Sequence, residues 1–568
     1  MNKAITSNWK RICLFLGVIA IILITGILLS APSPADPIPA SLQYPVVEVK
    51  PLGPGKRPQT LDLAGAKNEH VLLHCRFPGA DFSSFKIKIV ETSRRPQASK
   101  ITTGFYQLCW VPPSAMGKLP PDALLPIEQG LVQTGSNLDI VVVMHISPNA
   151  AQGSFQYELA ASDKKQSYRQ PVKVRIYNFS LPDDLPIPIF GGFWNYKPEH
   201  YVKYGVHSFP EYLETIKSYY SNMRRYKMNT LGGAYFFPFE ELQPEKKIED
   251  FQDYHQLLSY ALNQLQYRWF MIPKLRGWRT VNQPGSDFVT QANVFYPLYQ
   301  EYLKRHGWQD RALNYLIDEP PPEHYPAVQQ AFAISKSLAP AIKTLCAGWN
   351  PAPEFVQVID IWATPASYYK EPQANAARSQ GQKQWLYANR LHGIDHPQVH
   401  QRLIGWILHR YKFDGYLLWG VNFWPNDPWT TEPGAQDYMR RGTFYYPHPQ
   451  NGQPVPTLRL ESLRRGLQDY QYLHLLTEAH RRSQVPPAAF ADIEQRVQTL
   501  TANFQGSDFP VPMQELESLR LQIGELLHGA GSAPGPVPPK INPPPAPARP
   551  SPKGGVFQDL LGYFLNRN

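Results

Sequence analysis

The sequence predicts an α/β protein: a (β/α)8 TIM barrel, preceded by an antiparallel β-sandwich domain and followed by a C-terminal helical segment. The chain has 568 residues, which is too many for one hydrophobic core, so two or more domains are expected. Between about residues 45 and 180, short strand-like segments follow one another without helical periodicity, as in a sandwich. From about residue 186 to 480, eight strand-like segments alternate with crossovers, over roughly the ~250 residues typical of a barrel.

The amino-terminal region reads as a targeting segment and a linker. Lys10 and Arg11 precede a mostly apolar run at 12–30, and a Pro-rich linker follows at 31–44. Positive residues before the run, with none just after it, predict that residues 1–11 stay in the cytoplasm and that the rest crosses the membrane. Because the run has about the ~18 residues needed to span, we expect a single-pass signal anchor or a secretory signal peptide. The protein is then extracytoplasmic, in the cell envelope.

Residues 45–182 form the predicted sandwich domain. Segments such as HVLLHCRF and DIVVVMHISP are apolar or alternating and rich in β-branched residues. Cys75 and Cys109 both fall in this region, where export allows a disulfide between them, and two separate buried thiols are the alternative. Asn178 begins a glycosylation sequon, which we interpret as a turn.

Residues 183–480 form the predicted barrel domain. The connection at 350–357 is too short for an ordinary helix, so an open doubly wound sheet is the alternative architecture. The eight predicted strands are Ile187–Trp194, Met228–Phe236, Arg268–Leu275, Leu313–Glu319, Ile342–Trp349, Val358–Ala363, Gln384–Asn389 and Asp414–Trp424.

Helix signals lie between these strands. Ser208 and Glu211 form a capping box that begins a helix with one apolar face. Two further helices are predicted at 296–306, where Gly307 ends the helix, and at 397–411.

Helices are also predicted beyond the eighth strand. One spans 457–476, and a C-terminal helical segment occupies 481–528. The tail at 529–568 begins with a long Pro-, Ala- and Gly-rich stretch that cannot bury a core, so we expect it to be disordered.

Composition favours a glycan partner over nucleic acid or metal. The net charge is +10, but Lys and Arg are scattered instead of forming the stripe of a nucleic-acid binder. The sequence contains neither a CxxC pair nor an HExxH motif, so no metal and no cofactor are expected. The 13 Trp and 32 Tyr residues suit a cleft that stacks on sugar rings. No sequence signal indicates a particular oligomeric state.

Asp318 and Glu319 are the candidate catalytic residues. They end the fourth strand, and Pro320 and Pro321 follow, which lack the N–H groups needed to continue a ladder. Adjacent side chains of a regular strand face opposite ways, so both carboxylates share one site only where the strand ends and twists. Barrels place their chemistry at the carboxyl ends of strands. The alternative to a catalytic role is an ordinary strand end, at which the aspartate caps the turn and the glutamate is solvated.

Aromatic and polar residues follow several other strands. They suit an uncharged, hydroxyl-rich substrate, because indoles stack on C–H faces and amides bond hydroxyl groups. Packing within the barrel is the alternative for each aromatic residue. The predicted substrate-binding residues are Trp194, Tyr235, Arg276, Trp349, Tyr387, Asn389, Trp419, Asn422 and Trp424.

Two neighbouring carboxyl groups favour one form of glycoside cleavage. Conventional glycosidases flank the sugar with carboxylates roughly 5–9 Å apart on opposite faces, which adjacent residues on one strand cannot easily do. They suit substrate-assisted cleavage, in which a 2-acetamido oxygen of the sugar is the nucleophile. One acid protonates the leaving oxygen, and its neighbour holds the acetamido N–H. Asp360 and Asp414 also lie in predicted strands and are weaker candidates for a conventional nucleophile.

Several ordered motifs between about residues 45 and 480 resemble the family 123 glycoside hydrolases. They are VKVRIYNFSLP (172–182), LIDEPP (316–321), FDGYLLWGVNFW (413–424) and LRLESLRRGLQDYQYLHLL (458–476). The resemblance implies a retaining, substrate-assisted exo-β-N-acetylgalactosaminidase on a (β/α)8 barrel, without a cofactor. It assigns Asp318 to orienting the acetamido group and Glu319 to general acid/base catalysis. One departure is the stretch RRGTFYYP (440–447), where relatives usually carry a Gly-Asp-Gly-like turn.

Two other functions fit the same fold. One is a non-catalytic carbohydrate-binding or envelope-scaffolding protein held by its N-terminal helix. The other is a glycosidase for a different sugar. If the protein is a glycosidase, Glu319 must be protonated to begin the catalytic cycle. We expect the protonated form because burial and the neighbouring Asp318 both favour it.

Overall fold

The computed structural model describes residues 44–531, apart from gaps at 52–57, 94–98, 112–119, 133–136, 195, 234–236, 276–282, 350, 389–390, 395, 425, 431–440 and 507–510. The predicted membrane segment at 12–30, most of the linker and nearly all of the C-terminal tail lie outside the described residues. Within the described ranges, no helix combines the length and apolar character needed to cross a membrane.

Eight parallel strands close into a barrel, which confirms the predicted fold class and excludes the open sheet. Closure comes from the pairing of the first strand with the last, Phe190 lying opposite Leu417. In the described part of the short fifth-to-sixth connection there is a 3-10 turn at Pro353–Phe355 and no α-helix. In order around the barrel the strands are β10 (Ile189–Gly192), β11 (Thr230–Gly232), β12 (Trp269–Met271), β13 (Ala312–Asp318), β14 (Lys343–Ala347), β15 (Ile361–Pro365), β16 (Lys383–Tyr387) and β17 (Gly415–Leu418).

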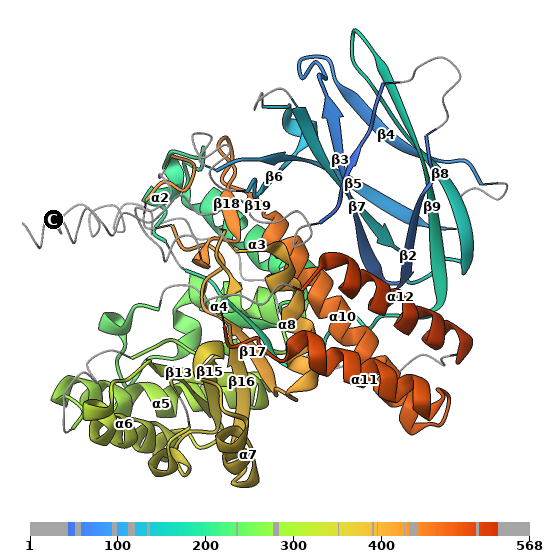
Figure 1. The fold of residues 1–568 in the computed structure, drawn as a ribbon. Helices are drawn as coiled ribbons and strands as arrows, with labels where there is room; N and C mark the ends of the chain where they lie inside the picture. Colours follow the sequence, from blue (N-terminus) through green and yellow to red (C-terminus); the bar gives the residue numbers. More distant parts are fainter. Residues whose placement is uncertain are drawn as a thin grey trace, which may run out of the picture.

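Helices pack outside the barrel (Figure 1). The predicted capping box is present, since the Ser208 hydroxyl accepts from the Glu211 N–H at 3.4 Å and the Glu211 carboxylate accepts from the Ser208 N–H at 3.0 Å. The helices are α2 (Glu199–Val202), α3 (Phe209–Arg225), α4 (Gln252–Ser259), α5 (Ser286–His306), α6 (Tyr325–Leu338), α7 (Glu371–Ser379) and α8 (Gln398–Arg410).

Helix α5 begins ten residues earlier than predicted. The prediction placed Pro297 in the first turn, but the helix starts at Ser286 and runs through this proline. Pro297 is exposed, so the backbone carbonyl that loses its N–H partner lies on the solvent side of the helix. The predicted end is right, because Gly307 adopts the left-handed conformation (φ 67°) that closes the helix.

The sandwich consists of two sheets whose inner faces share one hydrophobic core. Two of its pairings are parallel, β1 with β3 and β2 with β9, so the sheets are not purely antiparallel as predicted. The first sheet contains β1 (Val46–Glu48), β3 (Glu69–Pro78), β7 (Asn137–Ile146), β5 (Ile101–Cys109) and β6 (Ala123–Pro126); the second contains β2 (Leu61–Lys67), β9 (Ser167–Ser180), β8 (Gly153–Ser162) and β4 (Lys86–Glu91).

The structure decides between the two alternatives for the cysteines and corrects the interpretation of Asn178. Cys75 and Cys109 are separate buried thiols, because strand β7 lies between the strands that carry them. Asn178 lies in strand β9 and not in a turn. Its side-chain amide donates to the His528 carbonyl oxygen at 2.9 Å, so the sequon nitrogen already has a protein partner.

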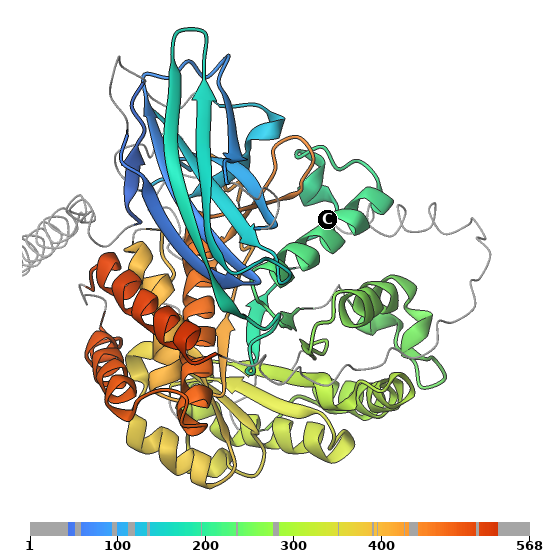
Figure 2. The ribbon, with the colours of Figure 1, turned by 90° about the vertical axis from the view of Figure 1, so that its right-hand side faces the viewer.

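A hairpin of β18 (Tyr445–Pro447) and β19 (Pro454–Pro456) leads, within the described residues, to helices α10 (Leu458–Arg481), α11 (Pro487–Thr501) and α12 (Met513–Gly529). Helix α10 packs on α8 of the barrel, and α12 packs on α10 and on sandwich strands β2 and β9. Figures 1 and 2 show α10 and α12 between the sandwich and the barrel. These helices therefore join the two domains.

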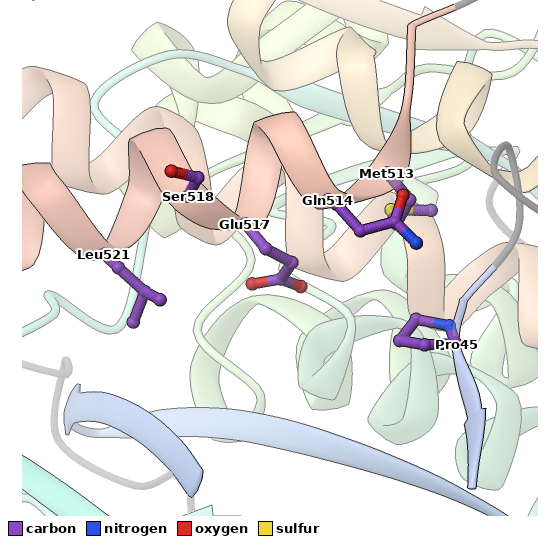
Figure 3. A pocket seen from close by; sticks show the side chains of 6 residues that line it. All are labelled: Pro45, Met513, Gln514, Glu517, Ser518 and Leu521. Carbon is purple, nitrogen blue, oxygen red and sulfur yellow. The ribbon is translucent and has the colours of Figure 1, made fainter.

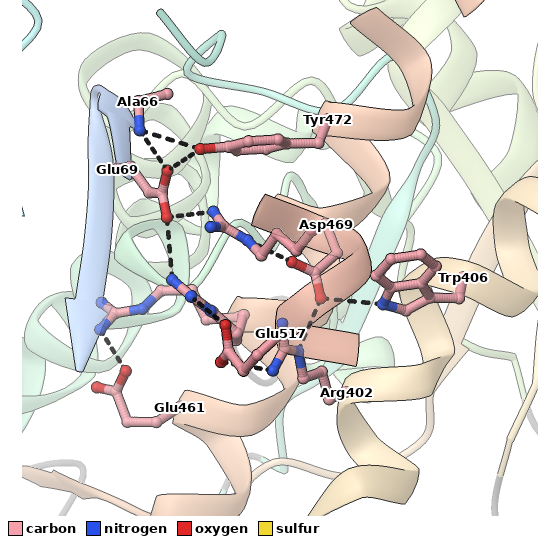
Figure 4. Close-up of polar contacts among 11 residues, drawn as sticks. Ala66, Glu69, Arg402, Trp406, Glu461, Asp469, Tyr472 and Glu517 are labelled. Carbon is pink, nitrogen blue, oxygen red and sulfur yellow. Dashed lines mark hydrogen bonds and ion pairs between the residues drawn. The ribbon is translucent and has the colours of Figure 1, made fainter. Parts of the chain in front are cut away.

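A closed ring of alternating charges, here called the charge ring, lies at this junction (Figure 4); four of its members are buried, and Arg465 and Glu517 are half-buried. It links the sandwich with α8, α10 and α12, and it contains three acids and three arginines, so its formal charge is zero. Asp469 of α10 is one of its acids and accepts from Arg402 at 2.8 Å and from Arg520 at 2.6 Å. In order, the ring runs Glu69, Arg520, Asp469, Arg402, Glu517, Arg465 and back to Glu69.

Candidate active site at the barrel mouth

Asp318 and Glu319 lie at the carboxyl end of β13, where the sequence predicted them. Asp318 is the last strand residue, and the Glu319 N–H still donates to the Ala347 carbonyl oxygen of β14 at 2.9 Å. Glu319 then turns the chain with a φ of 42°, in the left-handed region that non-glycine residues rarely adopt. Such strained backbone clusters at functional sites, where the surrounding structure holds it in place.

A β-bulge in β13 sets the direction of the Asp318 side chain. The register against β14 shifts between Tyr315, opposite Leu345, and Ile317, opposite Cys346. Tyr315 packs with the barrel interior, whereas Leu316 and Ile317 both belong to the core outside the barrel. The extra residue reverses the alternation, so Asp318 returns to the same side as Tyr315.

Both carboxyl groups bond to tyrosines of the barrel interior. The Tyr315 hydroxyl donates to Asp318 Oδ1 at 2.6 Å. Tyr387, the last residue of β16, hydrogen-bonds the Glu319 carboxyl group. Tyr315 and Tyr387 belong to one interior cluster, so the two acids are directed toward the same part of the barrel mouth.

The two acids have different surroundings. Glu319 is half-buried, and burial followed by the neighbouring Asp318 carboxylate raises the pKa of Glu319; the Tyr387 hydrogen bond lowers this pKa to a smaller extent. Asp318 is exposed and holds the Tyr315 bond. Unequal environments for two neighbouring acids favour a proton donor beside an ionised partner.

An aromatic cluster stands where β10 and β17 meet. Trp194 is 43% exposed, and its ring centroid lies 4.7 Å from that of Phe423 and 6.2 Å from that of Trp419. Gly192 permits this close approach, because a Cβ there would lie 2.0 Å from the Trp419 carbonyl oxygen. The predicted residues Trp194 and Trp419 are thus together, with an exposed indole at the strand ends.

Asn422 and Trp424 are buried in the segment that follows β17. Asn422 is fully buried; its Oδ1 accepts from the Trp194 N–H at 2.8 Å, and its Nδ2 donates to the Trp194 carbonyl oxygen at 3.0 Å. Trp424 is also buried, and its Nε1 donates to the Tyr445 carbonyl oxygen at 3.0 Å. Asn422 therefore holds the backbone of Trp194, and Trp424 packs inside the protein, so neither presents a surface to substrate, as the sequence had suggested.

A second aromatic pair follows β14, which is next to the strand that carries the acids, and β15, the strand after it. Trp349 and Tyr368 meet edge to face, with ring centroids 4.6 Å apart, and Tyr368 is 42% exposed. The remaining predicted residues, Tyr235, Arg276 and Asn389, lie outside the described residues.

Sequence reasoning missed several residues at this mouth, namely Tyr315, Tyr368, Phe423 and Lys274. Lys274 follows β12, and its Nζ lies 5.3 Å from the centroid of the Tyr315 ring. Tyr315 was hidden because simple alternation puts it on the face opposite Asp318. An apolar run gives no signal for a bulge, so no pattern in the sequence could have found this pair.

The carboxylates proposed as conventional nucleophiles lie at the opposite end of the barrel. Asp360 immediately precedes β15 and accepts from Lys336 at 3.0 Å and from Thr344 at 2.9 Å. Asp414 precedes β17 and accepts from Lys383 at 3.2 Å. Both sit at amino ends of strands, so neither reaches a sugar held at the carboxyl ends.

A hollow of about 390 Å³ lies elsewhere, between Pro45 and α12 (Figure 3). Met513 and Leu521 give it a mostly apolar wall. Its one acid, Glu517, is paired with Arg402 at 2.6 Å and Arg465 at 3.0 Å. This hollow offers no unpaired acid for chemistry. Among the described residues, no three His, Cys, Asp or Glu side chains gather to hold a metal ion.

Comparison with known proteins gives a match to one family's domain model and a fold. Residues 274–476 match the model of the glycoside hydrolase 123 catalytic domain. A family 123 glycoside hydrolase from Clostridium perfringens, studied for glycolipid glycan hydrolysis, superimposes with a TM-score of 0.60 at 14% identity, covering 83% of this chain and 93% of that one. A β-glucuronidase from Parabacteroides merdae has a TM-score of 0.29 at 11% identity, covering 71% of this chain and 52% of that one. A search of curated protein sequences gave no significant match.

Proposed function

Because residues 274–476 match the model of the glycoside hydrolase 123 catalytic domain, we propose that this protein is a glycosidase, which removes terminal β-linked 2-acetamido sugars resembling N-acetylgalactosamine. The reaction retains the anomeric configuration and uses the sugar's own acetamido group as nucleophile. The observation that carries the proposal is the adjacent pair Asp318–Glu319 at the barrel mouth, with both carboxyl groups directed to one interior cluster and a raised pKa at Glu319.

The two acids divide the work in the first step. The protonated Glu319 gives its proton to the glycosidic oxygen as the bond to the anomeric carbon breaks. The acetamido carbonyl oxygen attacks that carbon and forms a cyclic oxazolinium intermediate. Positive charge develops on the acetamido nitrogen, and the Asp318 carboxylate accepts its N–H and stabilises this charge.

The second step returns the enzyme to its starting state. The Glu319 carboxylate takes a proton from water as the water oxygen attacks the anomeric carbon. The ring opens, the acetamido group is restored, and Glu319 is again protonated. Two inversions at one carbon give net retention. Asp360 and Asp414 lie at the far end of the barrel and are paired with lysines, so neither can serve as a conventional nucleophile, which supports a nucleophile supplied by the substrate.

The exposed aromatics suit a glycan substrate. Trp194, which follows β10, and Tyr368, which follows β15, are partly exposed, and aromatic rings of this kind stack on the C–H faces of sugars. The Clostridium perfringens relative acts on glycolipid glycans, which agrees with a terminal sugar entering an open barrel mouth.

A panel of aryl glycosides tests the proposal. It pairs 2-acetamido with 2-hydroxy sugars of both galacto and gluco configuration, in α and β linkage. Hydrolysis of β-linked 2-acetamido substrates, with 2-hydroxy partners left intact, is expected because assisted cleavage requires the acetamide. Equal cleavage of 2-hydroxy glycosides would exclude the assisted mechanism, and binding of sugar without any turnover would favour the carbohydrate-binding alternative.

The pH profile follows from Glu319. Its pKa is raised, so the protonated acid persists to higher pH than an ordinary glutamic acid, and activity declines only as pH rises through this raised pKa. Tyr387→Phe removes a donor that favours the ionised form, so we expect the alkaline limb of kcat to move to higher pH. A limb that moves to lower pH would contradict the bond between Tyr387 and Glu319.

We also propose that the segment 12–30 exports the protein and holds it in the cell envelope, as its apolar length and flanking charges indicate. Expression of the full chain and of a form lacking residues 1–30, followed by fractionation, tests this. Recovery of the full chain in the soluble cytoplasmic fraction would contradict it.

A further inference from the structure

Tyr315 is hydrogen-bonded to one of the two proposed catalytic carboxyl groups. Its hydroxyl donates to Asp318 Oδ1 at 2.6 Å. The tyrosine precedes the aspartate by three positions, and in a regular strand these two side chains face opposite sides. The bulge at Leu316 brings them to the same side, so this contact depends on the irregularity in β13.

The ring of Tyr315 is fixed independently of Asp318. It meets Phe190 of β10 edge to face, with centroids 6.1 Å apart, and packs in the barrel interior cluster. Lys274 lies 5.3 Å from the ring centroid, on the neighbouring strand end. The phenol hydroxyl is therefore a hydrogen-bond donor at a fixed position. Fixed donors of this kind hold carboxylates in one orientation in protein sites.

The protonation of Tyr315 supports a lasting donor role. Burial, and after it the Asp318 carboxylate, raise the pKa of the Tyr315 phenol well above its ordinary value, so the proton stays on the tyrosine. Asp318 accepts this bond with one oxygen. The other oxygen is left to accept the acetamido N–H of the substrate.

We propose that Tyr315 is a positioning residue, which holds the Asp318 carboxylate so that its second oxygen meets the acetamido N–H. This role rests on the proposed function. The β-bulge in β13 is required for this role, because it brings the Tyr315 hydroxyl and the Asp318 carboxylate to the same side of the strand. The acetamido nitrogen carries more positive charge in the transition state than in the bound substrate, so a misoriented Asp318 lowers kcat more than it raises KM.

A double-mutant cycle tests the role, with wild type, Tyr315→Phe, Asp318→Asn and the double variant assayed on a dinitrophenyl β-glycoside of a 2-acetamido sugar. The activated leaving group keeps low activities measurable. We expect Tyr315→Phe to lower kcat by roughly 10–100-fold with little change in KM. In the Asp318→Asn background the same change should cost no more than about twofold, because Tyr315 acts through Asp318.

The outcomes separate the two claims. An equal loss of kcat from Tyr315→Phe in both backgrounds would mean that the hydroxyl only supports packing, and the positioning role fails while the function stands. A wild type that cleaves no substrate of the glycoside panel overturns the proposed function and this role with it. Recovery of kcat by p-aminophenylalanine at position 315, which keeps the ring and a donor, supports the role, and loss of kcat equal to that of Tyr315→Phe counts against it.

Discussion

Glu319→Gln is expected to lower kcat on 2-acetamido glycosides by about 10²–10⁴-fold, the usual contribution of a general acid. The amide keeps the shape of the side chain and its place beside Tyr387 but cannot give up a proton to the leaving oxygen. The loss should be smallest for leaving groups that need no protonation, so a nitrophenyl series with graded leaving-group acidity measures the effect directly.

Stability separates this loss from unfolding. The pKa of Glu319 is raised in the folded state, so the stability that this carboxyl group contributes is present at low pH and is lost as pH rises through the folded-state pKa. The amide introduced by Glu319→Gln does not ionise. The variant should therefore match wild type in acid and unfold at a slightly higher temperature than wild type at neutral pH.

Glu323→Gln is the matched control, because Glu323 is exposed and lies four residues beyond Glu319 in the following 3-10 turn. Its activity should equal that of wild type. Unchanged kcat in Glu319→Gln, across the whole leaving-group series, would remove Glu319 from the role of acid.

Asp469→Asn is expected to destabilise the fold by about 3–5 kcal/mol, the usual result of removing one partner from a buried ion pair. Asp469 is fully buried and accepts from Arg402, Arg520 and the Trp406 indole at 2.8, 2.6 and 2.9 Å. The neutral amide leaves the charge ring with one excess positive charge away from water. Urea unfolding measures the loss, and it should appear as a lower midpoint of the main transition.

Glu478→Gln tests the same change on the same helix in a solvent-facing pair. Glu478 meets Arg481, whose side chain is 69% exposed, so this substitution should change stability by less than about 1 kcal/mol. A cost for Asp469→Asn as small as that of the control would show that the charge ring is not needed to join the sandwich to α10 and α12.

The sequence predicted the barrel well because its strands are short apolar runs that end in turns or polar residues, which local patterns reveal. It could not predict the parallel pairing of β1 with β3, since that depends on which strands meet in space. The early start of α5 was missed because Pro297 is usually a helix-starting signal, and only the exposed position of its turn explains why the helix tolerates it.

In the site as well, the residues marked by local sequence signals were predicted, and those that depend on contacts between strands were not. Asp318 and Glu319 were found because two prolines mark the strand end. Asn422 was assigned to substrate because amides often bond sugars, but the fold uses both ends of this amide on the Trp194 backbone. Tyr315 was missed because the bulge that turns it toward Asp318 follows from the register with β14 and not from residue type.

The central claim is that the acetamido oxygen of the substrate is the nucleophile. The most direct test is to measure the rate of cleavage for substrates whose acetamido methyl group carries an increasing number of fluorine atoms. Fluorine withdraws electron density from the carbonyl oxygen, so an oxygen that attacks the anomeric carbon becomes a weaker nucleophile with each substitution. We expect kcat/KM for aryl β-glycosides to fall steeply from acetyl to fluoroacetyl to difluoroacetyl to trifluoroacetyl. A rate that stays constant across the four acyl groups would show that the sugar does not supply its own nucleophile.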